Sequence, residues 1–468
     1  MLWSAADAAA ATGGEVRGDW AGVDGLSIDT REIAQGDLFV ALTGENRDGH
    51  AFVGAALEAG AGAAMVSQVP DGIPGEAPLL IVKDTLLALE ALGAAARART
   101  NARVIAVTGS VGKTSTKDMI QTMLAGQGRV HAAVRSFNNH WGVPLTLARM
   151  PAESDWAVIE IGMNHAGEIA PLSRLARPHI ALITTVAPVH LEAFDGIGGI
   201  ADAKAEIFAG LEPGGTAILN ADIDMYPRLA AAAEGFRIVT FGEGDTEYHM
   251  PHALIEPART VVELEAPEFT MTFRLGTPGR HLALNAVAAM AAVIEAGGDP
   301  AASARPLERW TPPDGRGKRV AIDLPQGGHI LLLDESYNAN PTSVEAALSV
   351  LAVTGQRKAR RHAILGDMLE LGPKEVEFHR DLAKLLAVEA IGKIHCCGPL
   401  MRNLWERLPT ETRGQYAEDS DGLAQSVQSV LAPGDICMVK GSLGARMSVI
   451  VGAITGLGKA RPARDEDL

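Results

Sequence analysis

Residues 103–115 constrain this chain more than any other segment. An apolar run at 104–108 is typical of a buried strand, a glycine turn follows at 109–112, and Lys113 opens a polar helical stretch. Glycines let backbone N–H groups approach phosphate oxygens, and the helix N-terminus adds a partial positive charge. In such loops a lysine spans the β and γ phosphates and a hydroxyl binds magnesium. The segment therefore predicts a nucleotide-phosphate loop, with ATP contacts from Thr108, Gly109, Ser110, Val111, Gly112, Lys113, Thr114 and Ser115.

The loop departs from the common phosphate-loop pattern at one position. G-x-x-x-x-G-K-[ST] requires glycine at 107, where this chain has Val107, so the loop reads T-G-x-x-G-K-T. A glycine-rich turn with an exposed lysine is the alternative interpretation. The glycine turn lies directly between an apolar strand and a helix, and this position favours the phosphate-binding interpretation.

Short apolar runs alternate with helical stretches in three successive parts of the chain, which predicts βαβ units. TPPDGRGKR at 311–319 has the composition of an interdomain linker. The runs TVVELEA and FTMTFRL predict an antiparallel edge, and the C-terminal tail GKARPARDEDL is expected to be frayed. We expect an α/β protein with a small N-terminal domain (1–99), a central, doubly wound, mostly parallel sheet (100–313) and a Rossmann-like C-terminal domain (314–468).

Composition narrows the class of protein. The 468 residues include 57 acidic and 41 basic ones, a formal charge of −16, which argues against a surface that binds nucleic acid or anionic membranes. No apolar run is long enough to cross a bilayer, and the N-terminus is a poor signal peptide. Three cysteines, Cys396, Cys397 and Cys437, make no disulfide framework. We expect a cytoplasmic monomer.

Three further residues lie where ligands of an open α/β sheet gather, at or beyond strand ends. Glu160 ends an apolar strand and suits Mg²⁺, although a strand-end acid can also face solvent. His190 follows the predicted strand HIALITTV and could equally be a hydrogen-bonded loop residue. Lys204 lies in the helix IADAKAEIF, where a solvated lysine is the simpler interpretation. Magnesium would repel its ammonium, so a metal-site role for Lys204 requires a chemical change.

The chain resembles the Mur ligases. The resemblance extends in family order from about residue 26 to 442, in the segments SIDTREIAQGDLFVALTGENRDGHAFV, TGSVGKTSTK, SFNNHWGVPLTL, VIEIGMNHAGEIA, APVHLEAFDGIGGIADAKAEIF, GRHLALNAVAA, DESYNANPTS, LGDMLELG and VKGS. The phosphate loop and the GRHLALNAVAA helix are shared with all members and with folylpolyglutamate synthases. The FNN, EIGMNHAGEI and DESYNANP segments are more specific and resemble the dipeptide-adding members.

The resemblance implies the cofactors ATP and Mg²⁺, with one or two ions. Thr114 and Glu160 would bind magnesium, and His190 would face a second ion. Lys204 matches a lysine that many members carry as a carbamate, formed when CO₂ reacts with the neutral amine. Burial favours that neutral form, because it lowers a lysine pKa.

The resemblance also implies roles for residues of all three domains. Asn285 would contact adenine, Asp334 the ribose, and a linker arginine the γ-phosphate; Arg316 and Arg319 both fit that spacing. The residues implied for catalysis are Lys113, His190, Lys204, Arg316 and Arg319. The residues implied for substrate binding are Ser27, Asp29, Thr30, Arg31, Arg47, Asp48 and His50 for the UDP-sugar, Asn138 and Asn139 for the reacting carboxylate, and Tyr337, Asn338 and Asn340 at the junction with the nucleotide.

The implied reaction is ATP-driven amide synthesis. D-alanyl-D-alanine would be joined to UDP-N-acetylmuramoyl-tripeptide through an acyl phosphate, giving the pentapeptide, ADP and phosphate for peptidoglycan precursor synthesis. The third residue of the tripeptide and the general base stay open, with His281 one candidate base. The rivals are the diaminopimelate-adding Mur enzyme, disfavoured because no DNPR segment is present, a folylpolyglutamate synthase, a phosphate-loop ATPase or kinase, and an inactive nucleotide-binding module.

Overall fold

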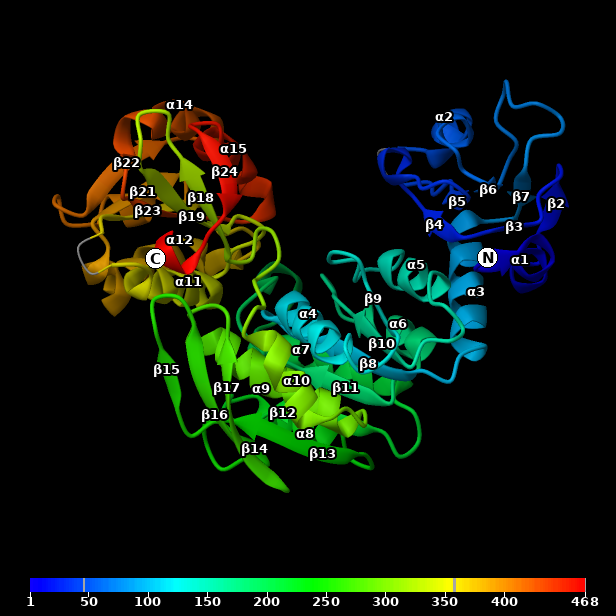
Figure 1. Cartoon of the computed structure of the whole chain (residues 1–468), viewed down its shortest axis with the longest axis horizontal. Helices are drawn as coiled ribbons and strands as arrows, with labels where there is room; N and C mark the ends of the chain where they lie inside the picture. The colour runs from blue at the N-terminus through cyan, green and yellow to red at the C-terminus, as the bar shows by residue number, and fades with distance from the viewer. Residues whose placement is uncertain (45–46, 357–358, 468) are drawn as a thin grey trace.

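The computed structural model describes residues 1–44, 47–356 and 359–467, and it folds them into three α/β domains in chain order. In Figure 1 the N-terminal domain (blue) and the C-terminal domain (yellow to red) lie on opposite sides of the central domain. Each of the three contains one main sheet, which confirms the predicted fold class. The bounds 1–99, 100–313 and 314–468 stay a prediction.

The N-terminal domain is a five-stranded sheet in the order β2-β7-β6-β5-β4, parallel except for β2. Its strands are β1 Trp3–Ser4, β2 Glu15–Arg17, β3 Gly22–Val23, β4 Gly25–Ser27, β5 Asp37–Val40, β6 Ala63–Val66 and β7 Leu79–Ile81, and its helices are α1 Ala5–Thr12, α2 Val53–Glu58 and α3 Thr85–Ala98. The apolar core of this domain continues into the central domain, where Leu145 and Ala148 join it. The two domains are therefore joined by buried apolar surface.

The central domain is a ten-stranded sheet whose parallel part runs β14-β13-β12-β11-β8-β10-β9. Its strands are β8 Arg103–Thr108, β9 Val130–Ala132, β10 Trp156–Glu160, β11 Ile180–Ile183, β12 Thr216–Asn220, β13 Arg237–Gly242, β14 Tyr248–His249, β15 Ala253–Ile255, β16 Thr260–Ala266 and β17 Phe269–Leu275. Its helices are α4 Lys113–Leu124, α5 Gly142–Ala148, α6 Ile169–Ala176, α7 Ile197–Ala205, α8 Tyr226–Ala232, α9 Arg280–Glu295 and α10 Pro300–Leu307. Separate apolar cores on the two faces confirm the doubly wound sheet, and β15, β16 and β17 confirm the antiparallel edge.

The C-terminal domain is a seven-stranded sheet in the order β22-β21-β20-β23-β19-β18-β24. Its strands are β18 Lys318–Asp323, β19 His329–Glu335, β20 Arg361–Gly366, β21 Lys393–Cys397, β22 Arg413–Ala417, β23 Ile436–Lys440 and β24 Lys459–Pro462, and its helices are α11 Pro341–Val353, α12 Glu375–Asp381, α13 Arg402–Trp405, α14 Ser420–Val430 and α15 Ser448–Thr455. The prediction of a frayed tail was wrong. Strand β24 pairs with β18, and Arg461 forms ion pairs with Asp323 and Asp467.

Polar contacts link the C-terminal domain to the central one. Arg319 in β18 donates to the carbonyl oxygens of Ala258, at 3.0 Å, and Gly276, at 2.6 Å, beside the antiparallel edge. On another side, His190 of the central domain meets Glu370 of the C-terminal domain. Such contacts can be exchanged for water at little net cost.

The structure also bears on the cysteines and on membrane-spanning helices. Cys396, Cys397 and Cys437 are buried free thiols, and burial raises the pKa of each. Among the described residues, no helix has both the length and the apolar character needed to span a bilayer.

Two histidines form a buried polar chain between β20, β21 and the start of β23. His395 Nδ1 accepts from the backbone N–H of Gln415 at 3.1 Å, so its Nε2 carries the proton and faces His362 Nδ1 at 3.2 Å. His362 Nε2 in turn lies 3.4 Å from a carboxylate oxygen of Asp435. This arrangement satisfies both rings only while they are neutral, and burial lowers the pKa of His362 and lowers that of His395 to about 4.

Acid should therefore destabilise the C-terminal domain. Because the folded-state pKa of His395 lies below its ordinary value of 6.5, its stabilising effect is complete above pH 6.5 and is lost as the pH falls toward 4. We expect the free energy of unfolding to fall by about 1.4 kcal/mol per pH unit per buried histidine below 6.5. Urea unfolding between pH 7 and pH 5 measures this slope. His395→Gln should flatten it and the exposed His252→Gln should not; equal slopes in all three proteins would contradict the assignment.

Candidate active site

The glycine turn between β8 and α4 has a backbone that other residues adopt only with strain. Gly109 has a φ of 147° and Gly112 a φ of 87°. A Cβ atom at 109 would overlap the Thr184 hydroxyl, and one at 112 would lie 2.8 Å from the Asn285 side-chain oxygen. The turn is therefore possible only with glycine at both positions. Asn285, predicted to contact adenine, lies against this turn from α9.

The segment after β11 fixes the turn in place. Ser110 donates its backbone N–H to the carbonyl of Thr185 at 2.9 Å, and its hydroxyl donates to the carbonyl of Ala187 at 3.0 Å. The hydroxyl of Thr184 donates to the carbonyl of Val111 at 2.6 Å. A phosphate arriving here meets a preformed backbone, which reduces the entropy lost on binding.

Lys113, at the start of α4, bends back over the turn. Its Nζ donates to the carbonyl of Gly109 at 2.6 Å. Loss of water around the ammonium lowers its pKa to about 8, and the nearby Glu160 carboxylate opposes that shift. A phosphate oxygen is a stronger acceptor than this carbonyl, so the lysine can exchange one for the other.

Glu160 ends β10 and is fully buried beside the turn. One carboxylate oxygen accepts from the Thr114 hydroxyl at 3.1 Å and from the Asn138 side-chain amide at 2.7 Å. The other oxygen has no hydrogen-bond partner. A buried carboxylate oxygen without a partner, next to a hydroxyl, fits a hard cation such as Mg²⁺. No cluster of three or more His, Cys, Asp or Glu side chains suited to a metal occurs in the described ranges, so oxygens of the nucleotide and water would complete such a site.

His190 and Lys204 lie farther along the same edge of the sheet. His190 has a left-handed backbone, with a φ of 53°, and its Nδ1 lies 2.5 Å from a carboxylate oxygen of Glu370. Burial lowers the His190 pKa, while Glu370 opposes the shift. Lys204 is only 2% exposed, and burial, with the nearby Lys113, lowers its pKa well below the ordinary value. Burial therefore favours the neutral form of this amine.

The structure separates the two linker arginines. Arg316 donates to the Ser136 hydroxyl at 3.0 Å, and that hydroxyl lies 3.1 Å from the Thr114 hydroxyl. The Arg319 guanidinium is instead bound to the two carbonyl oxygens beside the antiparallel edge. Arg316, and not Arg319, thus lies next to the Thr114 and Glu160 side chains.

Several residues that are predicted to contact ligands also make contacts within the protein. Asn139 accepts from the backbone N–H of Gly142 at the start of α5, and Asn340 caps α11. Asp334 accepts from Ser336 and from the backbone N–H of Gly315 in the linker. The Asn338 side chain accepts from the N–H of Ala339, and Tyr337 stacks under the Arg316 guanidinium at 4.1 Å.

The predicted sugar-nucleotide residues lie at the carboxyl edge of the N-terminal sheet. At the end of β4, the hydroxyl of buried Ser27 donates to the Asp29 carbonyl. Asp29 pairs with exposed Arg31, which lowers the Asp29 pKa to about 2. Thr30 opens the short helix that follows Asp29, and the Arg47 carbonyl accepts the backbone N–H of Gly44 at 2.8 Å.

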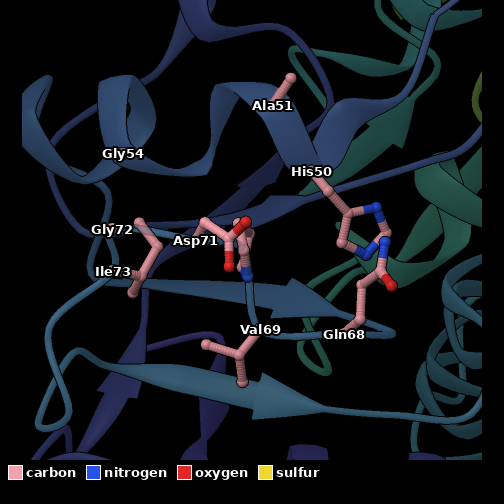
Figure 2. A pocket seen from close by; sticks show the side chains of 9 residues that line it. His50, Ala51, Gly54, Gln68, Val69, Asp71, Gly72 and Ile73 are labelled. Atoms are coloured by element: carbon pink, nitrogen blue, oxygen red, sulfur yellow. The ribbon is translucent and has the colours of Figure 1, made fainter.

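His50 lies between two partners in the same domain. Its Nδ1 is 2.6 Å from an Asp48 carboxylate oxygen, and its Nε2 accepts from the backbone N–H of Ser67 at 2.9 Å. A cavity of 510 Å³ opens beside it (Figure 2), lined by His50, Ala51, Gly54, Gln68, Val69, Pro70, Asp71, Gly72 and Ile73. This cavity lies in the N-terminal domain, apart from the glycine turn.

Sequence reasoning missed four residues of the central site: Ser136, Thr184, Lys117 and Glu370. Hydroxyls carry no periodic signal, so Ser136 could be found only by its place two residues before Asn138. Glu370 could not be found from spacing, because its partner is 180 residues away.

Fold and site together define a multidomain α/β protein with a glycine turn of the kind that binds nucleotide phosphates. Family models match in three parts: "Mur ligase family, catalytic domain" at 22–122, "Mur ligase middle domain" at 107–293, and "Mur ligase, glutamate ligase domain" at 320–443. The chain belongs to the Mur ligase family, which confirms the resemblance seen in the sequence.

Similar proteins cover nearly the whole chain. It is 35% identical to the UDP-N-acetylmuramoyl-tripeptide–D-alanyl-D-alanine ligase of Bacillus subtilis, over 92% of each chain. It is also 35% identical to the Escherichia coli enzyme of the same name, over 94% of this chain and 96% of that one. A crystal structure of MurF from Acinetobacter baumannii superposes with a TM-score of 0.81 at 31% identity, covering 97% of this chain and 99% of that one.

The glycine turn allows a direct test. We expect Gly109→Ala to weaken nucleotide binding by about tenfold or more, because backbone strain of about 1–3 kcal/mol must be relieved by moving the turn. Titration with a fluorescent ATP analogue measures the affinity. Gly126→Ala, after the end of α4, is the matched control, because its Cβ would meet no atom within 4 Å. Unchanged affinity in a folded Gly109→Ala protein would show that the turn does not bind phosphates.

Proposed function

We propose that this chain is an ATP-dependent ligase that joins D-alanyl-D-alanine to the terminal carboxylate of UDP-N-acetylmuramoyl-tripeptide. The products are UDP-N-acetylmuramoyl-pentapeptide, ADP and phosphate. One observation carries the proposal: Lys113, Glu160 and the interdomain Arg316 meet at a single glycine turn, in a chain that matches enzymes of that name along nearly its whole length. A cytoplasmic location and a monomeric state belong to the same proposal.

The chemistry requires two anions to meet. The substrate carboxylate attacks the γ-phosphorus of ATP, the bond to the ADP oxygen breaks, and an acyl phosphate forms. The amine of D-alanyl-D-alanine then attacks the acyl carbon and loses a proton, and phosphate leaves. Lys113 and Arg316 would offset the repulsion between carboxylate and triphosphate. Arg316 suits this role because its linker lies between the two domains that must close on the nucleotide.

Thr114 and Glu160 would hold Mg²⁺, which supplies charge neutralisation for the γ-phosphate when bound. The unpartnered oxygen of Glu160 supports this assignment. His190 would face a second ion through Nε2, since its Nδ1 is occupied by Glu370. Asn138, which orients Glu160, would also lie near the reacting carboxylate.

Substrate and nucleotide roles extend to the flanking domains. We assign the sugar nucleotide to the carboxyl edge of the N-terminal sheet, where the pairs Asp29–Arg31 and Asp48–His50 lie. Asn285 would contact the adenine beside Gly112, and Asp334 the ribose. Tyr337 would line the junction of the two sites.

Product analysis tests the ligase reaction. Purified protein with ATP and Mg²⁺ should release ADP and phosphate only when both the UDP-linked tripeptide and D-alanyl-D-alanine are present. Lys113→Ala should lower the rate by about 100-fold or more, because the variant lacks the positive charge that would stabilise the transferring phosphate. Lys459→Ala, an exposed lysine on β24, is the matched control. Phosphate release without the amine would identify an ATPase, and ligation by Lys113→Ala would remove the assigned role of Lys113.

Lys204 should carry a carbamate. In that reaction the neutral amine attacks CO₂, a C–N bond forms, and a proton is released, giving an anion in place of a cation. Burial and Lys113 favour the neutral amine. With ¹³C-bicarbonate, we expect an NMR carbamate signal in the wild-type protein that is missing from Lys204→Arg.

Activity provides the second readout for Lys204. Removing bicarbonate should slow the wild-type enzyme and leave the residual rate of Lys204→Arg unchanged. A wild-type protein with full activity and no carbamate signal would exclude the modification.

A further inference from the structure

A continuous chain of polar contacts joins the interdomain linker to the buried carboxylate. Arg316 Nη2 donates to Ser136 Oγ at 3.0 Å, and Ser136 Oγ lies 3.1 Å from Thr114 Oγ1. Thr114 Oγ1 donates to Glu160 Oε1 at 3.1 Å. Ser136 is therefore the one contact between the arginine and the Thr114–Glu160 pair in this chain of four residues.

Proton counting fixes the direction of this chain. A guanidinium only donates, a carboxylate ion only accepts, and each hydroxyl has a single proton. Because Thr114 uses its proton for Glu160, Ser136 must donate to Thr114 and accept from Arg316. In this one arrangement each of the two hydroxyls donates once and accepts once, so the charge of Arg316 is coupled to that of Glu160 through them.

The backbone around Ser136 is held from several sides. Buried Lys117, one helical turn after Lys113 on α4, donates to the carbonyl of Ala133 at 2.9 Å. Arg135 has a left-handed backbone, with a φ of 58°. On the other side, the Asn138 carbonyl accepts from Gly162 at 2.8 Å. The hydroxyl of Ser136 is thus presented by a fixed loop.

Arg316 is held from the opposite side by its own domain. The Tyr337 ring lies 4.1 Å from its guanidinium carbon. Asp334 accepts the N–H of Gly315 with a side-chain oxygen at 3.2 Å and that of Gly317 with its carbonyl at 2.7 Å. Between ring and hydroxyl, the guanidinium is confined to a position next to the phosphate turn.

We propose that Ser136 is a positioning residue that holds Arg316 ready to contact the γ-phosphate. The proposal rests on the ATP-dependent reaction proposed above. Ser136 touches no reacting atom, because it acts through Arg316, which keeps this hydrogen bond and turns its other N–H groups to the phosphate oxygens when ATP binds. Prior placement of the guanidinium reduces the entropy lost in forming that contact. The effect of Ser136 should therefore depend on the presence of a γ-phosphate.

A comparison of nucleotides tests this dependence. We expect Ser136→Ala to weaken binding of the non-hydrolysable analogue AMPPCP, with Mg²⁺, by about tenfold, the size of one charge-assisted hydrogen bond. Its affinity for ADP should be unchanged, and kcat should fall with little change in the KM for D-alanyl-D-alanine. Ser136→Thr keeps the hydroxyl and should restore AMPPCP affinity. Ser349→Ala, which removes a hydroxyl on exposed α11, is the matched control.

A double variant separates positioning from local structure. In an Arg316→Ala background, adding Ser136→Ala should have no further effect on AMPPCP affinity, because the residue to be positioned is gone. Equal losses for ADP and AMPPCP, or additive losses in the double variant, would overturn the proposal. If the wild-type protein forms no amide bond, the ligase function fails, while the ADP and AMPPCP affinities still decide the role of Ser136.

Discussion

A carboxylate buried beside the glycine turn is the feature on which the rest of this site depends. Glu160 is fully buried with one unpartnered oxygen, an arrangement that is costly unless positive charge comes to it. The chain brings that charge from several directions. Lys113, at the start of α4, bends back over the glycine turn. Arg316 of the C-terminal domain is linked to Glu160 through the hydroxyls of Ser136 and Thr114. In the proposed reaction, a divalent cation bound with the nucleotide would complete the charge balance.

The two flanking domains are attached in physically different ways. The N-terminal domain shares an apolar core with α5, so separating it would expose buried surface. The C-terminal domain is joined by the Arg319 contacts, the His190–Glu370 pair and the Arg316–Ser136 hydrogen bond. Because polar contacts of this kind can be remade with water or a ligand, the C-terminal domain is the one suited to move when the nucleotide binds.

Local features were predictable because their signals are local. The strand, glycine turn and helix at 103–124 follow from apolar periodicity and from the conformational freedom of glycine, and the antiparallel edge follows from alternation. The roles of amides are harder to predict, because asparagine also suits helix ends. Asn139 and Asn340 each satisfy the N-terminus of a helix, and their predicted substrate contacts stay a prediction. The prediction of a frayed C-terminal tail was wrong because its strand depends on pairing with β18, which is distant in sequence.

The sequence by itself determined the family, the α/β class and the glycine turn, because each depends on contiguous residues whose chemistry needs no distant partner. Only the tertiary structure shows that Arg316, and not Arg319, lies beside the glycine turn. Both lie in the same short segment, but β18 turns the Arg319 side chain toward carbonyl oxygens of the central domain, while the preceding linker leaves Arg316 beside Ser136. The directions of these two side chains depend on how the central and C-terminal domains meet. Residue spacing along the sequence does not determine the direction in which a side chain points across such a junction.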